Sequence, residues 1–413
     1  MSALTLALAY GIWYAYSVIL VALLAEFGWS RSVLAGAFSV FTLVHGAVNP
    51  LVGALCARFK PLRVSAVGGA AMGVALFADS FIATPLHLYL GFGVLTAVAV
   101  AAGGWVPALV HVQREFQDRL GLAIGLISAG VGVGMVLVVP LTQILIDAFG
   151  WRTAFQVLAV LSVVWIVPSS LWLMRATQRE NQGQSPIKQH QEEPGSDPRK
   201  PEQDREKSGS DPITLREAMR TQAFWLLVAA FFFGNVCSQT LHVHQVAYLV
   251  DHGLAAIVAA SVVSVVGLAS IVGKIGGGWL SDRVERELVY VAGIAILSSS
   301  VFMLLALGAA PTRWGAYGFA VLLGVGYSVT ATLTPAMVSD RFSGRHFGAI
   351  VGIGLMGSAA GSAVGPWFAG RLYDATGSYT VPFMITAACG LLAGAAGWRA
   401  RALRRRQIAA RKC

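Results

Sequence analysis

Long apolar segments recur along almost the whole chain, and they restrict its fold more than any other feature. Each has roughly 20 residues or more, enough to cross the hydrocarbon core of a bilayer as a helix. Only helices and closed barrels satisfy the backbone in lipid, and these segments are too long and too continuously apolar for barrel strands. The sequence therefore predicts an all-α polytopic membrane protein with twelve transmembrane helices. The predicted spans are residues 2–25, 32–56, 63–83, 87–111, 120–147, 153–174, 222–249, 255–280, 288–309, 314–338, 346–373 and 380–398.

The composition agrees with this fold and argues against a soluble enzyme. Hydrophobic residues make up 56% of the 413 residues and charged residues 12%, which is about half of the charged fraction usual in soluble domains. The four cysteines have no disulfide or zinc spacing, and no catalytic motif of convincing spacing occurs. We therefore expect no enzyme activity, no cofactor and no metal. The net charge of +10 reflects membrane topology, so no nucleic-acid partner is expected.

The positions of the basic residues predict the orientation, because short cytoplasmic loops are enriched in lysine and arginine. Sixteen basic residues fall in alternate short loops and in the C-terminal tail. The opposite connections carry only Arg31, Arg152 and Arg313, with Arg371 near the end of a helix. We therefore expect both termini in the cytoplasm. The first apolar segment lacks a basic leader and is interpreted as a span rather than a signal peptide.

Residues 175–220 differ in kind from the rest of the chain. They contain nine basic residues, nine acidic residues, five prolines and the tetrapeptide Gly-Ser-Asp-Pro twice. Such a segment buries too little apolar surface to order itself, so a flexible cytoplasmic linker is predicted. It separates an N-terminal six-helix bundle, 1–174, from a C-terminal bundle, 221–398, which is followed by a basic cytoplasmic tail, 399–413. The linker ends with the capping-box spacing of Thr214 to Glu217.

The two halves match each other in two blocks without gaps. A shift of 225 residues places Glu26, Gly28, Ser39, Gly53 and Arg58 on Asp251, Gly253, Ser264, Gly278 and Arg283. A shift of 227 places Gly121, Gly125, Gly130, Gly134, Asp147 and Gly150 on Gly348, Gly352, Gly357, Gly361, Asp374 and Gly377. Both halves begin on the same side, which predicts a parallel repeat about an axis normal to the membrane. The spacing of four residues between these glycines predicts close helix packing.

A loop motif resembles the signature of the major facilitator superfamily. The run Gly278-Trp279-Leu280-Ser281-Asp282-Arg283 follows the eighth span, and the matching run from Gly53 to Arg58 has Ala57 where the family usually has aspartate. The resemblance covers essentially the whole chain and implies two six-helix bundles around a central cavity. It also implies that Asp282, Arg283 and Arg58 act in the conformational switch, with a weakened N-terminal latch.

Lys274 is the one basic residue predicted to lie deep inside a span. An ammonium at a helix centre costs about 2.5–3.5 kcal/mol on insertion scales, and such residues usually face a cavity and mark a substrate or ion path. Gly267, Ser270 and Gly278 share its helical stripe, which is small and polar. Every acidic residue except Asp79 falls in or beside a loop. A structural ion pair therefore has few candidate partners, and we expect the counter-charge to come from an anionic ligand.

Polar stripes on four other predicted spans indicate the same cavity. They comprise Tyr10, Trp13, Tyr14 and Ser17 on the first, His45 and Asn49 on the second, Asn235, Ser238, Gln239 and His242 on the seventh, and Tyr327, Thr330 and Thr334 on the tenth. His244 is turned about 200° from His242 at 100° per residue. The predicted substrate-binding residues are Lys274, Ser270, Asn49, His45, Tyr14, Tyr10, Asn235, Gln239 and Tyr327.

Two passages resemble the monocarboxylate transporters and their bacterial relatives, including oxalate/formate exchangers: the run from Glu26 to Arg31, and the cation on the eighth span. The resemblance implies transport of a small organic anion, often with a proton. Animal members have an aspartate and an arginine four apart on the eighth helix, where this chain has Ser270 and Lys274, and a lysine on the first, where it has Val18. Their proton machinery therefore cannot simply be transferred.

The sequence as a whole predicts a secondary active transporter of a monocarboxylate, a multi-pass protein of the cell membrane that works as a monomer. We expect Lys274 to bind proton and anion together with His45 or His242 as relay, because a lysine can release its proton in a low-dielectric site and an arginine cannot. Three alternatives stay open: a carboxylate exchanger, a drug or cation efflux carrier, and a non-transporting sensor of the same fold. An efflux carrier usually needs a membrane carboxylate.

Overall fold

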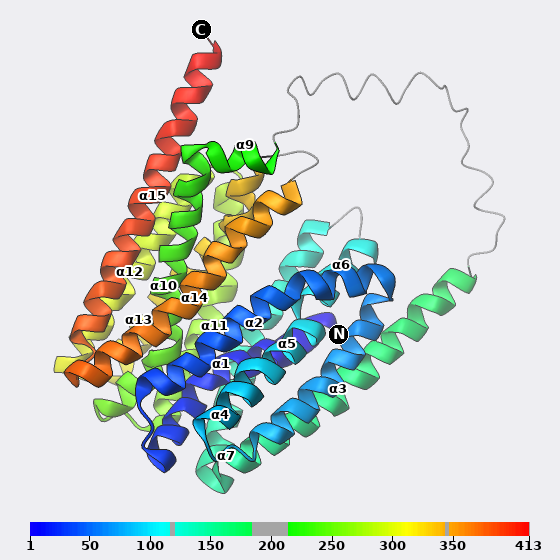
Figure 1. Ribbon diagram of the computed structural model, residues 1–413, viewed down its shortest axis with the longest axis vertical. Coiled ribbons are helices and arrows are strands. Elements are labelled where there is room, and N and C mark those ends of the chain that lie inside the picture. Colours follow the sequence, from blue (N-terminus) through cyan, green and yellow to red (C-terminus); the bar gives the residue numbers. More distant parts are fainter. Residues whose placement is uncertain (116–119, 184–213, 343–346, 413) are drawn as a thin grey trace.

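The computed structural model describes residues 1–115, 120–183, 214–342 and 347–412, and this part of the chain is helical without strands, as predicted (Figure 1). The N-terminal half contains α1 (Ser2–Phe27), α2 (Arg31–Arg58), α3 (Pro61–Asp79), α4 (Pro85–Leu88), the π-helical η1 (Tyr89–Thr96), α5 (Ala97–Gly103), α6 (Trp105–Glu115) and α7 (Leu120–Gly183). The C-terminal half contains α9 (Leu215–Arg220), α10 (Gln222–Asp251), α11 (Ala256–Ser281), α12 (Arg286–Ala309), α13 (Arg313–Ser339), α14 (Phe347–Thr376) and α15 (Thr380–Lys412).

Two of the predicted spans form the two arms of α7. The apolar stretch Ile124–Arg175 has 52 residues, and a straight helix of this length would measure about 78 Å, far more than the bilayer core of about 30 Å. Gly150 breaks the helix with φ 83° and ψ 162°, a left-handed conformation that glycine adopts without strain. The two arms meet at this turn, near the α7 label in Figure 1. The eleven apolar helices of the described residues therefore provide twelve spans.

The fourth span is less regular than the predicted continuous helix over 87–111. It is built from α4, η1, α5 and α6, and Gly104 interrupts it with φ −101° and ψ −124°. π-Helical segments inside α-helices are rare and often accompany functional sites. The hydrophobic pattern of this span contains no signal for either irregularity.

The structure describes helices in parts of the predicted linker and in the predicted tail. The second arm of α7 continues past residue 175 to Gly183, and residues 184–213 of the predicted linker lie outside the described residues. Thr214 and Glu217 form the predicted capping box at the start of α9. The last helix, α15, runs through the predicted tail to Lys412. Its arginines are held by ion pairs to the loop before α12, which the charge pattern alone did not indicate.

Glycines pack corresponding helices together in both halves. A Cβ added to Gly134 of α7 would lie 2.0 Å from the carbonyl oxygen of Ala7 in α1. A Cβ added to Gly361 of α14 would lie 2.2 Å from the carbonyl oxygen of Phe232 in α10. The backbones can approach this closely only without a side chain between them, as expected for small residues at membrane helix interfaces. The repeated glycines therefore serve packing, as predicted.

The contacts between the two bundles also follow the repeat. They run mainly between α2 and α14 and between α7 and α11, pairs that the shifts of 225 and 227 residues exchange. Figure 1 shows the two bundles tilted against each other, with α9 and the end of α15 at the top. We call the side with α9 and the end of α15 the linker side, and the side with the α7 turn at Gly150 the far side. Both α1 and α10 start at the linker side and end at the far side.

Candidate binding cavity between the bundles

A cavity of about 600 Å³ lies between the two bundles. Its walls come from α1 and α6 and the first arm of α7 on one side, and from α11 and α13 on the other. The lining residues of α7 are close to its start and those of α11 are close to its end, so the cavity occupies the linker-side half of the molecule. They include Tyr10, Trp105, Ile124, Gly125, Ser128, Ala129, Val131, Ile271, Lys274, Ile275, Gly278, Ala331 and Thr332.

Lys274 contributes the positive charge of this cavity. Its Nζ donates a hydrogen bond to the backbone carbonyl of Ser128, 3.1 Å away on the opposite bundle. No carboxylate of the described residues forms an ion pair with it. The candidate counter-ion, Asp79, lies in the N-terminal bundle, fully buried, and accepts a hydrogen bond of 2.8 Å from Thr96. The ammonium therefore faces the cavity with a neutral partner and with donors left over for an anion.

A second cavity, of about 120 Å³, adjoins the first and shares Ala331 with it. Residues from the predicted polar stripes of α1, α10 and α13 line it. Tyr14 and Tyr327 interact through their hydroxyl groups across the bundle interface. The residues that line it are Tyr14, Gly234, Asn235, Ser238, Gln239, Tyr290, Tyr327, Thr330, Ala331 and Thr334. Six of the nine predicted binding residues therefore line these two neighbouring cavities, and Ser270, His45 and Asn49 line neither.

His242 lies between the two tyrosines of this second cavity. Its ring centroid is 5.1 Å from that of Tyr14 and 4.7 Å from that of Tyr327. Nδ1 lies 2.8 Å from the Ser238 carbonyl oxygen, which can only accept, so Nδ1 carries a hydrogen. Nε2 is buried without a protein partner. It is available as an acceptor for water or a ligand.

His45 and Asn49 of α2 line neither cavity, but His45 packs against Tyr10, which lines the first one. His45 packs edge-on against Trp13 at 5.0 Å and against Tyr10 at 6.4 Å. Its Nδ1 is 3.4 Å from Nδ2 of Asn49. Buried polar atoms normally have partners, yet His45 Nε2, Asn49 Oδ1 and the Gln239 Oε1 have none. Of these residues only Gln239 lines a cavity, the second one, where its unpartnered oxygen can accept a hydrogen bond from water or a polar ligand.

Ser270 departs from the predicted arrangement. It is fully buried, donates to the Gly267 carbonyl of its own helix at 2.7 Å, and lies against α13 rather than in the lining of either cavity. Helical spacing placed it on the stripe of Lys274, but serines in membrane helices commonly satisfy their hydroxyl on the preceding turn. It interacts with Tyr327, which lines the second cavity.

The predicted switch residues lie at the linker side. The Arg283 guanidinium stacks on the Trp279 ring at 3.9 Å and donates to the Trp279 carbonyl, and Arg58 lies over the Phe59 ring at 5.6 Å. Asp282 caps the end of α11.

Acidic residues that sequence reasoning missed carry the ion pairs of this region. Glu285 pairs with Arg401 and Arg405, Glu287 with Arg341 and Arg404, and Asp340 with Arg286. Hydrogen bonds from Arg405 and Arg401 lower the pKa of Glu285 to about 2. The pairs made by Arg401, Arg404 and Arg405 tie α15 to the start of α12.

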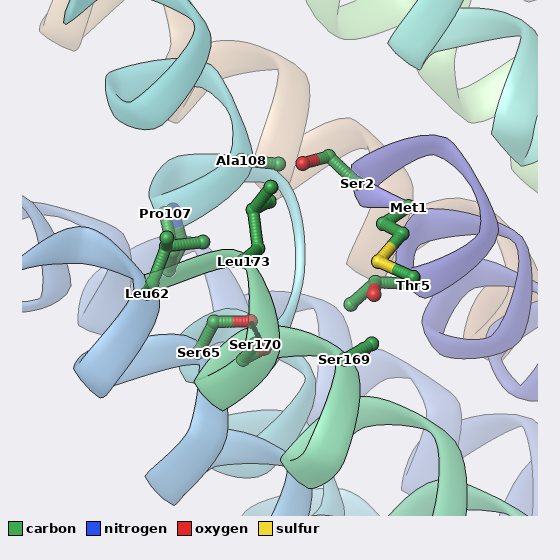
Figure 2. Close-up of a pocket in the computed structure, with 10 residues that line it drawn as sticks. All are labelled: Met1, Ser2, Thr5, Leu62, Ser65, Pro107, Ala108, Ser169, Ser170 and Leu173. Carbon is green, nitrogen blue, oxygen red and sulfur yellow. Dashed lines mark hydrogen bonds between the residues drawn. The ribbon is translucent and has the colours of Figure 1, made fainter. Parts of the chain in front are cut away.

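A further small cavity lies wholly within the N-terminal bundle (Figure 2). Hydroxyl and apolar side chains line it, and Ser170 and Ser65 are joined by a hydrogen bond of 3.3 Å. Its lining residues are Met1, Ser2, Thr5, Leu62, Ser65, Pro107, Ala108, Ser169, Ser170 and Leu173. None of them belongs to the C-terminal bundle, so this cavity is a packing gap rather than part of a path between the bundles.

The far side is closed by contacts centred on Arg31, at the start of α2. Its guanidinium forms an ion pair with Asp251 of α10, with nitrogen–oxygen distances of 2.9 and 2.7 Å, and donates to the Tyr379 hydroxyl at 2.6 Å. The backbone N–H groups of Arg31 and Ser32 donate to Asp374 of α14 at 2.9 Å each. Among the described residues this is the one ion pair between the bundles. Sequence reasoning placed Arg31 in an outer loop but gave no sign of its partners.

Comparisons with known proteins agree on one family. A family model described as the Major Facilitator Superfamily matches residues 2–307 and 245–412. Monocarboxylate transporter 13 of Bos taurus is 27% identical over 397 residues, covering 94% of this chain and 84% of the relative. Monocarboxylate transporter 12 of Mus musculus is 28% identical, covering 78% of this chain and 68% of the relative. Monocarboxylate transporter 4 of Mus musculus is 26% identical, covering 91% and 76%.

A solved structure shares the fold. It is a bacterial homolog of the human lysosomal transporter Spinster, in an inward-facing and unoccupied conformation. Its TM-score with this chain is 0.68 at 16% sequence identity, covering 97% of this chain and 96% of the other.

Proposed function

This chain belongs to the Major Facilitator Superfamily and is a multi-pass membrane transporter rather than an enzyme; from this premise we propose that it carries a small organic anion of the monocarboxylate class together with a proton. The relatives named monocarboxylate transporters support the substrate class. In this proposal the protein acts as a monomer in the cell membrane, and both termini are cytoplasmic. The far side is then the exterior, and the cavity at the linker side opens inward.

The observation that carries the proposal is the environment of Lys274. Its ammonium faces the cavity of about 600 Å³ between the bundles and has a neutral carbonyl as its partner. A carboxylate entering this cavity would supply the missing negative charge and form charge-assisted hydrogen bonds. Because the partner carbonyl belongs to Ser128 of the other bundle, an anion that displaces it changes the contact between the bundles. Substrate binding and domain movement would thus share one group.

The polar groups around this charge have distinct proposed roles. Tyr10 lines the cavity together with Lys274, while His45 packs against Tyr10 and, with Asn49, has an unpartnered polar atom. Tyr14, Asn235, Gln239 and Tyr327 would receive the rest of the substrate or its water in the adjoining cavity. Lys274 would also bind the proton, and His242 or His45 would relay it through an unpartnered Nε2.

Uptake by the purified protein in proteoliposomes tests the proposal. Radiolabelled lactate, pyruvate, acetate, oxalate and formate are offered with and without an inward pH gradient, and Lys274→Ala and Lys274→Gln are compared with the unchanged protein. We expect uptake of at least one monocarboxylate, and its loss by 10-fold or more in both variants, since removing one strong charged hydrogen bond costs about 1.5–3 kcal/mol. Lys60→Ala, at an exposed lysine between α2 and α3, is the matched control.

If anion uptake is unchanged by both Lys274 substitutions, the proposed binding site is wrong.

A carboxylate exchanger is the second candidate function, since the same cation would bind its substrate. Exchange would appear as uptake that requires substrate inside the vesicle and does not change with the pH gradient.

A further inference from the structure

A chain of hydrogen bonds connects a buried histidine to the contact that closes the far side. His244 of α10 is fully buried. Its Nε2 lies 2.9 Å from the carbonyl oxygen of Pro366 in α14, and its Nδ1 lies 3.0 Å from the hydroxyl oxygen of Tyr379. The same hydroxyl accepts a hydrogen bond from Arg31 at 2.6 Å. Three bonds thus join the core of the C-terminal bundle to the N-terminal bundle.

The direction of each hydrogen bond follows from what the groups can do. The Pro366 carbonyl can only accept, so Nε2 of His244 carries the hydrogen and Nδ1 is an acceptor. The Arg31 guanidinium can only donate, so the Tyr379 oxygen accepts from it and gives its own hydrogen to Nδ1. Burial raises the pKa of the Tyr379 hydroxyl, which keeps this hydrogen in place. Every donor and acceptor in this series of hydrogen bonds therefore has a partner when His244 is neutral.

Protonation of His244 would disrupt this arrangement of hydrogen-bond donors and acceptors. Both ring nitrogens would then donate, and the Tyr379 oxygen would face two donors while its own hydrogen lost its acceptor. A cationic imidazolium and the Arg31 guanidinium would flank one phenol. The charged and titratable groups on the elements around His244 are Arg31 of α2, Asp251, Tyr248 and His252 of α10, Tyr373 and Asp374 of α14, and Tyr379 before α15.

The acidic groups in this set are already engaged by the closed arrangement. Both oxygens of Asp251 accept from Arg31, and those of Asp374 accept from the backbone at the start of α2. Neither is hydrogen-bonded to His244. A proton on His244 therefore gains no new ion pair and disturbs the group that holds Arg31.

From this geometry we infer that His244 is a proton-binding site that keeps the far side closed while neutral and releases it when protonated. The site is separate from Lys274, since α10 turns His244 away from His242 toward α14 and the far side. Its part in transport rests on the proposed proton coupling. Opening of the far side on protonation would let a proton from that side admit the substrate that travels with it.

The test measures opening without any substrate, so its outcome does not depend on the proposed transport. Spin labels are attached at Ala83→Cys and Ala310→Cys, two exposed far-side positions in different bundles, after the four native cysteines are replaced by alanine. The distance distribution is recorded in lipid nanodiscs at about pH 5.5 and about pH 8, values that bracket the ordinary titration of histidine. We expect a longer-distance population to grow at the lower pH.

The variant His244→Gln tests whether protonation of His244 causes the opening, because glutamine can donate to Pro366 and accept from Tyr379 but cannot become charged. This variant should give the short distance at both pH values, whereas His87→Gln, an exposed far-side histidine, should respond as the unchanged protein does. Tyr379→Phe removes the link and should lengthen the distance at both pH values. A distance that does not change with pH in the unchanged protein, or a pH response that persists in His244→Gln, would overturn the inference.

Discussion

Lys274 combines a charge with a proton that it can give up, and these two properties can be separated by substitution. Lys274→Arg keeps the positive charge and can still bind a carboxylate, but a guanidinium stays protonated throughout the cycle. We expect this variant to retain exchange of external for internal substrate while losing most of the stimulation of uptake by a pH gradient. The ratio of uptake with and without the gradient measures the effect. Full pH-driven uptake by Lys274→Arg would disprove coupling through this residue.

Lys274 also illustrates which site residues a sequence reveals. A lone charge inside an apolar run is visible locally, and in the structure this residue lines an interdomain cavity. Its partner, the Ser128 carbonyl, carries no side-chain signal and became known only from the packing of α7 on α11. Ser270 shared the stripe of Lys274 by spacing, but helix packing buried it. Helical periodicity predicts the direction in which a side chain points, but it does not predict which residues of other helices that side chain contacts.

The glycines of α14 permit a direct test of helix packing. Gly361→Ala should destabilise the C-terminal bundle, because its new Cβ would lie 2.2 Å from the backbone oxygen of Phe232, which cannot move aside without shifting α10. Overpacking of this kind costs about 1–3 kcal/mol. Gly352→Ala, on the same helix with nothing within 4 Å, is the matched control. Thermal unfolding in detergent should show a lower midpoint for Gly361→Ala alone, and equal midpoints would contradict the packing role.

The ion pairs of α15 should be insensitive to the pH range in which transport is expected to respond. The pKa of Glu285 is lowered to about 2 by Arg405 and Arg401, so its contribution to stability is present above its ordinary pKa of about 4.3 and is lost as the pH falls toward 2. Glu285→Gln should therefore lower the thermal midpoint by the same amount from about pH 5 to about pH 8. The pH profile of uptake should keep its shape. A shifted profile would mean that this network takes part in proton coupling.

The spans themselves were predictable because each is coded by a local run of apolar residues, and the repeat followed from glycine spacing. The irregular fourth span was not, since Gly104 and the π-helical turn leave the hydrophobic pattern unchanged. Closure of the far side was not predictable either. Arg31 and Asp251 are 220 positions apart, and their meeting depends on how two complete bundles dock. Contacts of this kind are a property of the assembled fold, and they decide which side of the cavity is open.

Substitution of Arg31 should therefore change the ratio of molecules that are open on the far side to molecules that are closed there. Arg31→Gln removes the ion pair to Asp251 and the stacking on Tyr373, whose ring centroid lies 4.0 Å from the guanidinium carbon. Hydrogen bonds to charged groups contribute about 1.5–3 kcal/mol, and about 1.4 kcal/mol corresponds to a tenfold change in an equilibrium. Because Asp251 is one-third exposed, we take the lower end and expect the ratio of far-side-open to far-side-closed molecules to rise about tenfold.

The label pair at positions 83 and 310 measures this ratio directly, and Arg313→Gln, an exposed arginine on the same side, is the matched control. A protein held open on the far side should also lose net uptake, since the inward-opening half of the cycle becomes rare, while its affinity for substrate at the far side should rise. Closed-state distances that stay unchanged in Arg31→Gln would show that the packing of α2 on α14, with its Ser39 hydroxyl bonded to the Ala363 carbonyl, is sufficient to close the far side without the ion pair.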